Sequence, residues 1–171
     1  MSGRRRLVLA VLSAALALAP GLAAADEPTG CGAFKWPLDK ERAALTDSAK
    51  PMVANGGALA LNVAATLKLA PLADAGLPQT PERAPKFSPS YAGHFALAAP
   101  GAAGVYKITL VPDAWIDVVD GGRFLHPKAF SGALGCEGAR KSVKFELPAR
   151  PLDLQLSGVR ANAIAVIVSP E

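Results

Sequence analysis

Short segments of alternating apolar and polar residues fill the second half of the chain. They lie at residues 91–97, 106–110, 143–147 and 152–156, where the larger apolar side chains recur at every second position. This period of two is typical of a β-strand with one buried face. Turn sequences such as Asp120-Gly121-Gly122 separate such segments along the chain. The sequence therefore predicts an all-β fold, an antiparallel β-sandwich of a jelly-roll-like kind.

The alternation also predicts which side chains face inward. In residues 143–147, Val143, Phe145 and Leu147 are expected to be buried, with Lys144 and Glu146 exposed. In residues 152–156 the three leucines are expected to be buried, and Asp153 and Gln155 exposed. A slip of one residue would reverse every one of these assignments, so each strand tests the prediction in full.

Two earlier segments depart from the strand pattern. Residues 36–45 predict one short N-terminal helix, with Pro37 in its first turn and acidic residues near its start. Residues 71–89 contain five prolines. Because proline cannot donate a hydrogen bond to a sheet, this segment is expected to be a long surface loop.

The first 25 residues have the three parts of a secretory signal peptide. Arginines occupy positions 4–6, an uncharged apolar run spans 7–19, and three alanines precede Asp26. This order predicts cleavage near Asp26 and a periplasmic or secreted protein. The arginines leave two export routes open, the general secretory route and the twin-arginine route. No later segment is long and apolar enough for a membrane span.

The remaining residues, 26–171, predict a single β-sandwich domain with almost no net charge. Removal of the signal peptide removes three arginines and no acidic residue, which leaves 15 basic and 14 acidic residues. The high isoelectric point of the full chain therefore comes largely from the signal peptide. A nucleic-acid-binding protein needs a clustered basic face, and this composition does not point to one.

The chain has two cysteines, Cys31 and Cys136. In an oxidising compartment an even pair predicts a disulfide. Such a bond would tie the N-terminal segment to the rest of the domain. We expect it to be a structural cross-link without a redox role.

Several segments resemble a known type of module. Tyr91-Ala-Gly-His-Phe95, Trp115-Ile-Asp117-Val and Leu-Gln155-Leu-Ser-Gly158 are similar to the β-sandwich modules of the pre-peptidase C-terminal type. Those modules are appended to secreted bacterial peptidases. The chain as a whole resembles exported proteins of Gram-negative bacteria of uncharacterised function, through the sequences around Cys31 and Cys136. The resemblance implies a sandwich fold and an accessory role outside the cytoplasm.

The residues that carry chemistry do not form a complete catalytic motif. His94 and His126 are too far apart in sequence for a local metal pair, and no metal or cofactor is expected. The candidate ligand-binding residues are Trp115 with Asp117, and Arg140 with Lys141. Trp115 could present an aromatic surface to a sugar, and the two cations, with Lys144 nearby, form a small basic cluster.

These observations favour a non-catalytic binding or accessory module. Its expected partner is a glycan, a peptide or an envelope protein. Two alternatives stay open. One is an enzyme whose site is assembled in space around His94 or His126, and the other is a purely structural envelope protein.

Overall fold

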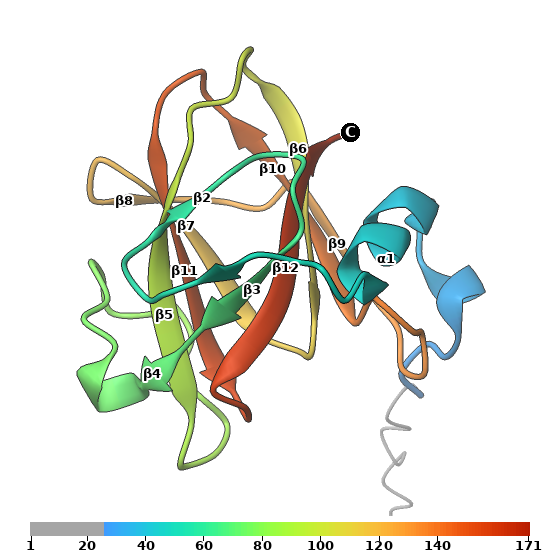
Figure 1. Ribbon diagram of the computed structural model, residues 1–171, viewed down its shortest axis with the longest axis horizontal. Helices are drawn as coiled ribbons and strands as arrows, with labels where there is room; N and C mark the ends of the chain where they lie inside the picture. Colours follow the sequence, from blue (N-terminus) through green and yellow to red (C-terminus); the bar gives the residue numbers. More distant parts are fainter. Residues whose placement is uncertain (1–25) are drawn as a thin grey trace, which may run out of the picture.

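The protein is mostly β-structure with a single α-helix, as the computed structural model of residues 26–171 shows (Figure 1). The helical elements are η1 (Cys31–Ala33), α1 (Asp39–Thr46) and η2 (Leu72–Asp74). The strands are β1 (Met52–Val53), β2 (Ala58–Leu59), β3 (Ala65–Lys68), β4 (Ala70–Pro71), β5 (Tyr91–Leu97), β6 (Gly104–Val111), β7 (Trp115–Asp120), β8 (Arg123–Leu125), β9 (Ala129–Gly132), β10 (Lys141–Leu147), β11 (Leu152–Val159) and β12 (Ala163–Pro170). The predicted signal peptide lies outside the described residues.

The strands form two mixed sheets. The first has the order β1-β3-β12-β6-β10-β9, and the second has the order β2-β5-β11-β7-β8, with β4 also paired to β5. The long strands pair antiparallel, as the sequence predicts. Two short pairs, β1 with β3 and β2 with β5, are parallel, so the expectation of a purely antiparallel fold is wrong. These parallel pairs arise because residues 52–59 add one short strand to each sheet, β1 beside β3 and β2 beside β5.

One apolar core takes side chains from both sheets. It includes Phe95 of β5, Ile108 of β6, Phe145 of β10 and Leu154 of β11, all fully buried. The predicted register of β10 is confirmed for its apolar residues, and Glu146 is exposed. The three leucines of β11 are likewise buried, as predicted.

The outward residues of the strands are less exposed than predicted. Gln155 is fully buried, and Lys144 and Asp153 are half-buried. Lys144 lies over the ring of Trp36, with its ammonium 4.3 Å from the ring centre. The prediction that Gln155 is exposed is wrong because another part of the chain covers the outer face of its sheet.

The N-terminal segment covers the outer face of the first sheet. Trp36 donates a hydrogen bond from Nε1 to Ser142 Oγ of β10. The predicted helix forms, but it begins at Asp39, two residues after Pro37. On α1, the buried Glu41 carboxylate lies 2.7 Å from Lys107 Nζ of β6 and accepts a hydrogen bond from Ser169. A helix with only eight residues is thus held by tertiary contacts rather than by its own propensity.

The proline-rich segment covers part of the outer face of the second sheet. We call residues 75–89 the strap, seen in green at the left of Figure 1. The Gln79 N–H donates to Gln155 Oε1 at 2.7 Å, and Gln155 Nε2 donates to the Gln79 carbonyl at 3.2 Å. At the start of the strap, Asn55 donates to the Ala75 carbonyl. The predicted loop is therefore a surface segment, but one that is bound to the sheet beneath it.

Candidate functional site

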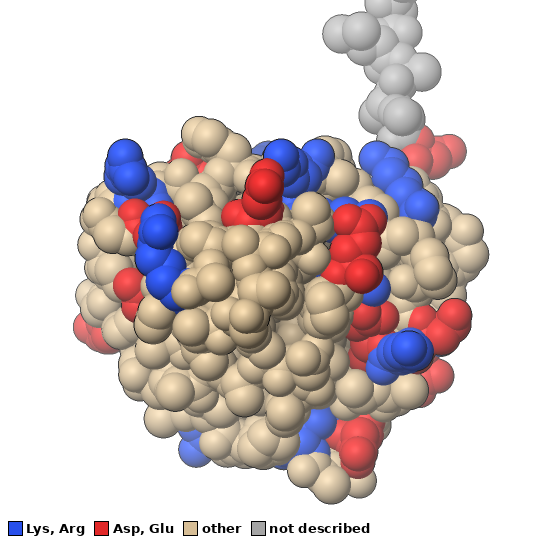
Figure 2. Space-filling view, turned by 90° about the horizontal axis from the view of Figure 1, so that it is seen from above, with Lys and Arg blue, Asp and Glu red and all other residues tan. Residues whose placement is uncertain are grey.

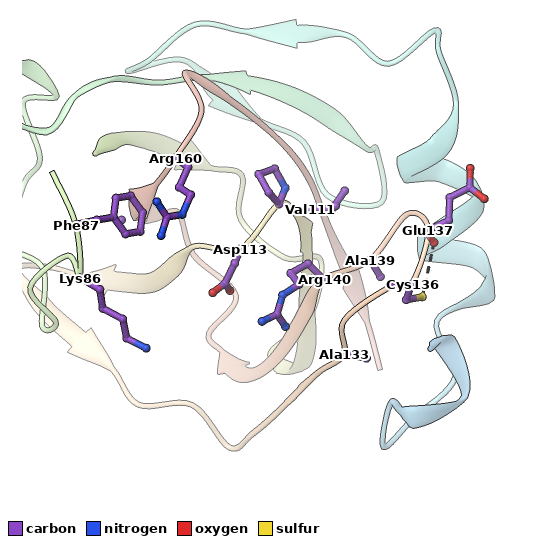
Figure 3. Close-up of a pocket in the computed structure, with 13 residues that line it drawn as sticks. Lys86, Phe87, Val111, Asp113, Ala133, Cys136, Glu137, Ala139, Arg140 and Arg160 are labelled. Carbon is purple, nitrogen blue, oxygen red and sulfur yellow. Dashed lines mark hydrogen bonds between the residues drawn. The ribbon is translucent and has the colours of Figure 1, made fainter. Parts of the chain in front are cut away.

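A groove of about 650 Å³ opens where three loops and one end of the strap converge (Figure 3). The strap contributes Lys86 and Phe87, and the β6–β7 connection contributes Asp113. Arg140 is the residue just before β10, and Arg160 lies in the turn between β11 and β12. These residues come from distant parts of the sequence, so only the fold assembles the groove.

The local backbone places Arg160 at the groove. β11 carries an irregularity in its pairing with β5 between Leu156 and Val159. Gly158, at this point, has a φ of 65°, a conformation that residues with a side chain rarely adopt. The same glycine lines the groove. The irregularity lies just before the last pair of the two strands, Val159 with Tyr91, after which the chain turns toward Arg160.

The charges around the groove are unequally paired. Arg140 forms an ion pair with Glu27, and Lys141 lies 2.6 Å from Asp113 at the groove edge. Arg160 stacks on the ring of Phe87, with its guanidinium carbon 3.9 Å from the ring centre. Within residues 26–171, no carboxylate lies within 4.0 Å of Lys86 or Arg160. Both side chains are therefore available to a negatively charged ligand.

The groove's positive character is local. On the face seen in Figure 2, basic and acidic side chains are interspersed around a broad uncharged area. Figure 3 instead shows Lys86, Arg140 and Arg160 approaching one space from different sides, with Asp113 as the acid between them. The ring of Phe87 adds an apolar surface beside these charges. This arrangement can hold a group that combines a negative charge with an apolar face.

Of the candidate residues predicted from sequence, Arg140 lines the groove and Lys141 borders it through Asp113. The predicted cluster with Lys144 does not form, since Lys144 lies over Trp36 and pairs with Glu171. Lys86, Phe87 and Arg160 were not predicted. They carry no local motif, and their proximity depends on how the strap and the β11–β12 turn meet.

Trp115 and Asp117 come together beneath the strap instead of in the groove. Trp115 Nε1 donates a hydrogen bond of 2.7 Å to Asp117 Oδ1. Asp117 is only 2% exposed, and burial raises the pKa of its carboxyl group, with the neighbouring Glu82 carboxylate adding to the rise. The indole ring is half-buried and lies under the guanidinium of Arg83, 5.4 Å from the ring centre. It therefore does not form the free aromatic platform that the sequence suggested.

The two histidines are not brought together with an acid. His94 is half-buried, with Nδ1 3.3 Å from the Ala75 carbonyl at the start of the strap. His126 is exposed after β8. Across the described part of the chain, neither imidazole has a carboxylate within 4.0 Å. The geometry thus lacks the acid–histidine pair that general acid–base catalysis around either residue would use.

The disulfide predicted from sequence is confirmed. Cys31 and Cys136 are bonded, with their Cα atoms 4.7 Å apart. Cys136 also lines the groove, so the cross-link holds one groove wall to the N-terminal segment. A stable disulfide is typical of a location outside the cytoplasm. Among the helices of residues 26–171, none has the length and apolar content to cross a membrane.

Comparisons with known proteins leave the groove as the main guide to function. No family model, curated protein or solved structure matches the chain. The resemblance to pre-peptidase modules therefore stays a prediction. In the described residues, no group of three or more histidine, cysteine, aspartate or glutamate side chains could hold a metal ion.

Proposed function

We propose that this protein is a periplasmic or secreted binding module whose groove recognises an acidic group on a glycan. The observation that carries the proposal is the convergence of Lys86 and Arg160, both without a carboxylate partner among residues 26–171, on a groove of about 650 Å³. Arginine and lysine bind carboxylate and phosphate groups through charge-assisted hydrogen bonds. Phe87 supplies a surface on which a sugar ring can pack.

The scaffold supports the same role. Both sheets contribute side chains to one apolar core, which favours a sandwich architecture as the support for the groove. Binding residues on loops held by a rigid β-scaffold are a common arrangement in recognition domains. Here the disulfide and the ion pair between Arg140 and Glu27 connect the groove wall to the N-terminal segment.

The proposal is tested by calorimetric titration with two oligosaccharides of equal length, one of uronic acids and one neutral. We expect the acidic one to bind and the neutral one to bind at least about tenfold more weakly. The double substitution Lys86→Ala with Arg160→Ala should lower the affinity for the acidic oligosaccharide by about tenfold or more.

A matched control removes the same charges elsewhere. Lys40→Ala with Arg123→Ala also deletes one lysine and one arginine, both exposed and outside the groove. Its affinity should stay within about twofold of the unmodified protein, since distant surface charges are screened. Equal losses in the two double variants, or equal binding of the neutral oligosaccharide, would overturn the proposal.

A further inference from the structure

A polar patch lies on the outer face of the second sheet, beneath the strap. It consists of Trp115 and Asp117 of β7 with Gln155 and Ser157 of β11, and we call it the strap face. Gln155 is paired with Asp117 across the strands, and Ser157 with Trp115. Asp117, Gln155 and Ser157 are at most 2% exposed. Four outward side chains with aromatic, acidic, amide and hydroxyl groups thus form one compact surface, of which only Trp115 is partly exposed.

The strap binds this face in the way that a separate peptide would. Gln155 uses both atoms of its side-chain amide on the main-chain N–H and carbonyl of Gln79. The side chain of Gln79 takes no part in these two bonds. An amide that pairs with a peptide unit in this manner recognises the main chain and does not depend on the side chain, as in peptide-binding surfaces. Further along the strap, Arg83 lies over the ring of Trp115.

As an occupant, however, the strap leaves the face incompletely satisfied. Asp117 Oδ2 and Ser157 Oγ are buried without a hydrogen-bond partner among the described residues. A buried polar atom without a partner costs roughly the desolvation of that group, and native proteins retain few of them. The strap places Glu82 beside Asp117, where the main-chain N–H of Glu82 lowers the pKa of Asp117 but its carboxylate, a like charge, raises it. The residue that would complement Asp117 is a cation, and the strap does not provide one there.

We propose that the strap face is a binding site for an extended, basic peptide segment of a partner protein, and that the strap occupies it in the absence of that partner. The partner's main chain takes the place of Gln79 at Gln155. A lysine or arginine of the partner pairs with Asp117, at the position where the strap carries Glu82. The strap face lies apart from the groove, although the strap also carries Lys86 and Phe87 of the groove wall. The proposal does not depend on the glycan proposal.

A synthetic peptide provides the test. It copies residues 77–87 with the substitution Glu82→Lys, and a second peptide keeps Glu82. Binding is followed by NMR through the indole N–H of Trp115. In the unmodified protein the strap competes at a high effective concentration, so we expect weak binding, with Kd near about 1 mM. The peptide with Glu82 should bind at least about tenfold more weakly than the lysine peptide, since it places a like charge at Asp117.

Two protein variants sharpen the test. Gln79→Pro with Arg83→Ala removes the N–H that Gln155 accepts and the cation over Trp115, and leaves the strap face unchanged. This opened variant should bind the lysine peptide about tenfold more tightly than the unmodified protein. Adding Asp117→Asn to the opened variant should lower its affinity for the lysine peptide by about tenfold or more. Arg140→Ala, a groove variant, should bind the peptide with unchanged affinity.

The outcomes separate clearly. The inference is overturned if the opened variant retains its fold, judged by thermal melting, and shows no binding up to several millimolar peptide. Equal affinity for the two peptides, together with an affinity unchanged by Asp117→Asn, would overturn it as well. If the opened variant does not fold, the titration of the unmodified protein decides: a saturable shift of the Trp115 signal that is weaker with the Glu82 peptide supports the site, and no shift refutes it.

Discussion

At the scale of single residues, Asp117 shows how an outward strand position became a buried one. The alternation of β7 puts Asp117 on the face away from the core, between the core residues Ile116 and Val118. The strap then covers it, and only one of its carboxylate oxygens has a hydrogen-bond partner in the described structure. A charged form in this position is costly because it has lost its contact with water.

This environment leads to a prediction about pH. The folded-state pKa of Asp117 lies above its ordinary value of 3.8. Below that folded pKa the native state binds a proton that the unfolded state does not, so the contribution of Asp117 to stability rises as the pH falls toward 3.8. The substitution Asp117→Asn removes this dependence and should raise the free energy of unfolding at pH 7 by about 1 kcal/mol.

Urea unfolding at pH 7 and pH 4.5 measures the difference between the two proteins. We expect the advantage of Asp117→Asn to shrink at the lower pH. Asp153→Asn is the control, since Asp153 also lies on the outer face of the second sheet but is only half-buried. An advantage that grows at pH 4.5 would contradict the raised pKa.

At the scale of elements, α1 depends on the sheet for its place. Apart from Ala43 its exposed residues are polar, and its two buried side chains are Glu41 and Leu45. Burial alone would raise the pKa of Glu41, but the hydrogen bonds from Lys107 and Ser169 outweigh it and hold the pKa below its ordinary value. This single carboxylate therefore joins the helix to β6 and β12.

We predict that Glu41→Gln costs up to about 3 kcal/mol of unfolding free energy at pH 7, because it leaves the largely buried Lys107 ammonium without its counter-charge. The loss should narrow as the pH falls below 4.5 through the lowered folded pKa, since the unmodified Glu41 then also loses its charge. Chemical denaturation at pH 7 and pH 3.5 checks both statements.

Asp39→Asn is the matched control on the same helix. Asp39 lies 3.7 Å from Arg42 with its side chain 87% exposed, and such surface pairs contribute little. We expect a change within about 0.5 kcal/mol. A loss equal to that of Glu41→Gln would show that the helix responds to any change of charge and that the buried pair has no special weight.

At the scale of the whole molecule, the disulfide joins the N-terminal segment to the groove wall. Cys31 and Cys136 are separated by 105 positions in the sequence. For a loop of this length, the chain-entropy account gives about 4–5 kcal/mol of stabilisation. We predict that Cys31→Ala with Cys136→Ala lowers the free energy of unfolding by about this amount and lowers Tm, as measured by thermal and urea denaturation.

In this account the disulfide stabilises the protein by restricting the unfolded chain. Reduction of the unmodified protein should therefore lower its stability by a similar amount to the double substitution. We expect the β10–β6 pairing and the apolar core to form without the disulfide. The far-ultraviolet circular dichroism at low temperature should therefore change little. A double variant as stable as the disulfide-bonded protein would show that the N-terminal segment is held by Trp36 and Glu41 alone.

Local patterns in the sequence were enough to predict the parts of the fold that depend on residue spacing. Strand alternation identified the inward side chains of β10 and β11, because a residue's neighbours two positions away share its face in any sheet. The number of cysteines identified the disulfide, since only one pairing exists. The short helix was also predicted, with a start three residues too early.

Which segments cover the outer faces of the sheets, and which loops meet, depends on contacts between residues far apart in the sequence. The alternation predicted an exposed Gln155, but Gln155 and Asp117 are both buried because the strap packs on them. Gln79 of the strap, which bonds to Gln155, lies 76 positions away from it in the sequence. Lys86 and Arg160 carry no motif and meet in the groove only once the strap and the β11–β12 turn are in place. The period of a strand is a property of neighbouring residues, whereas burial of its outer face is a property of whatever distant segment lies upon it.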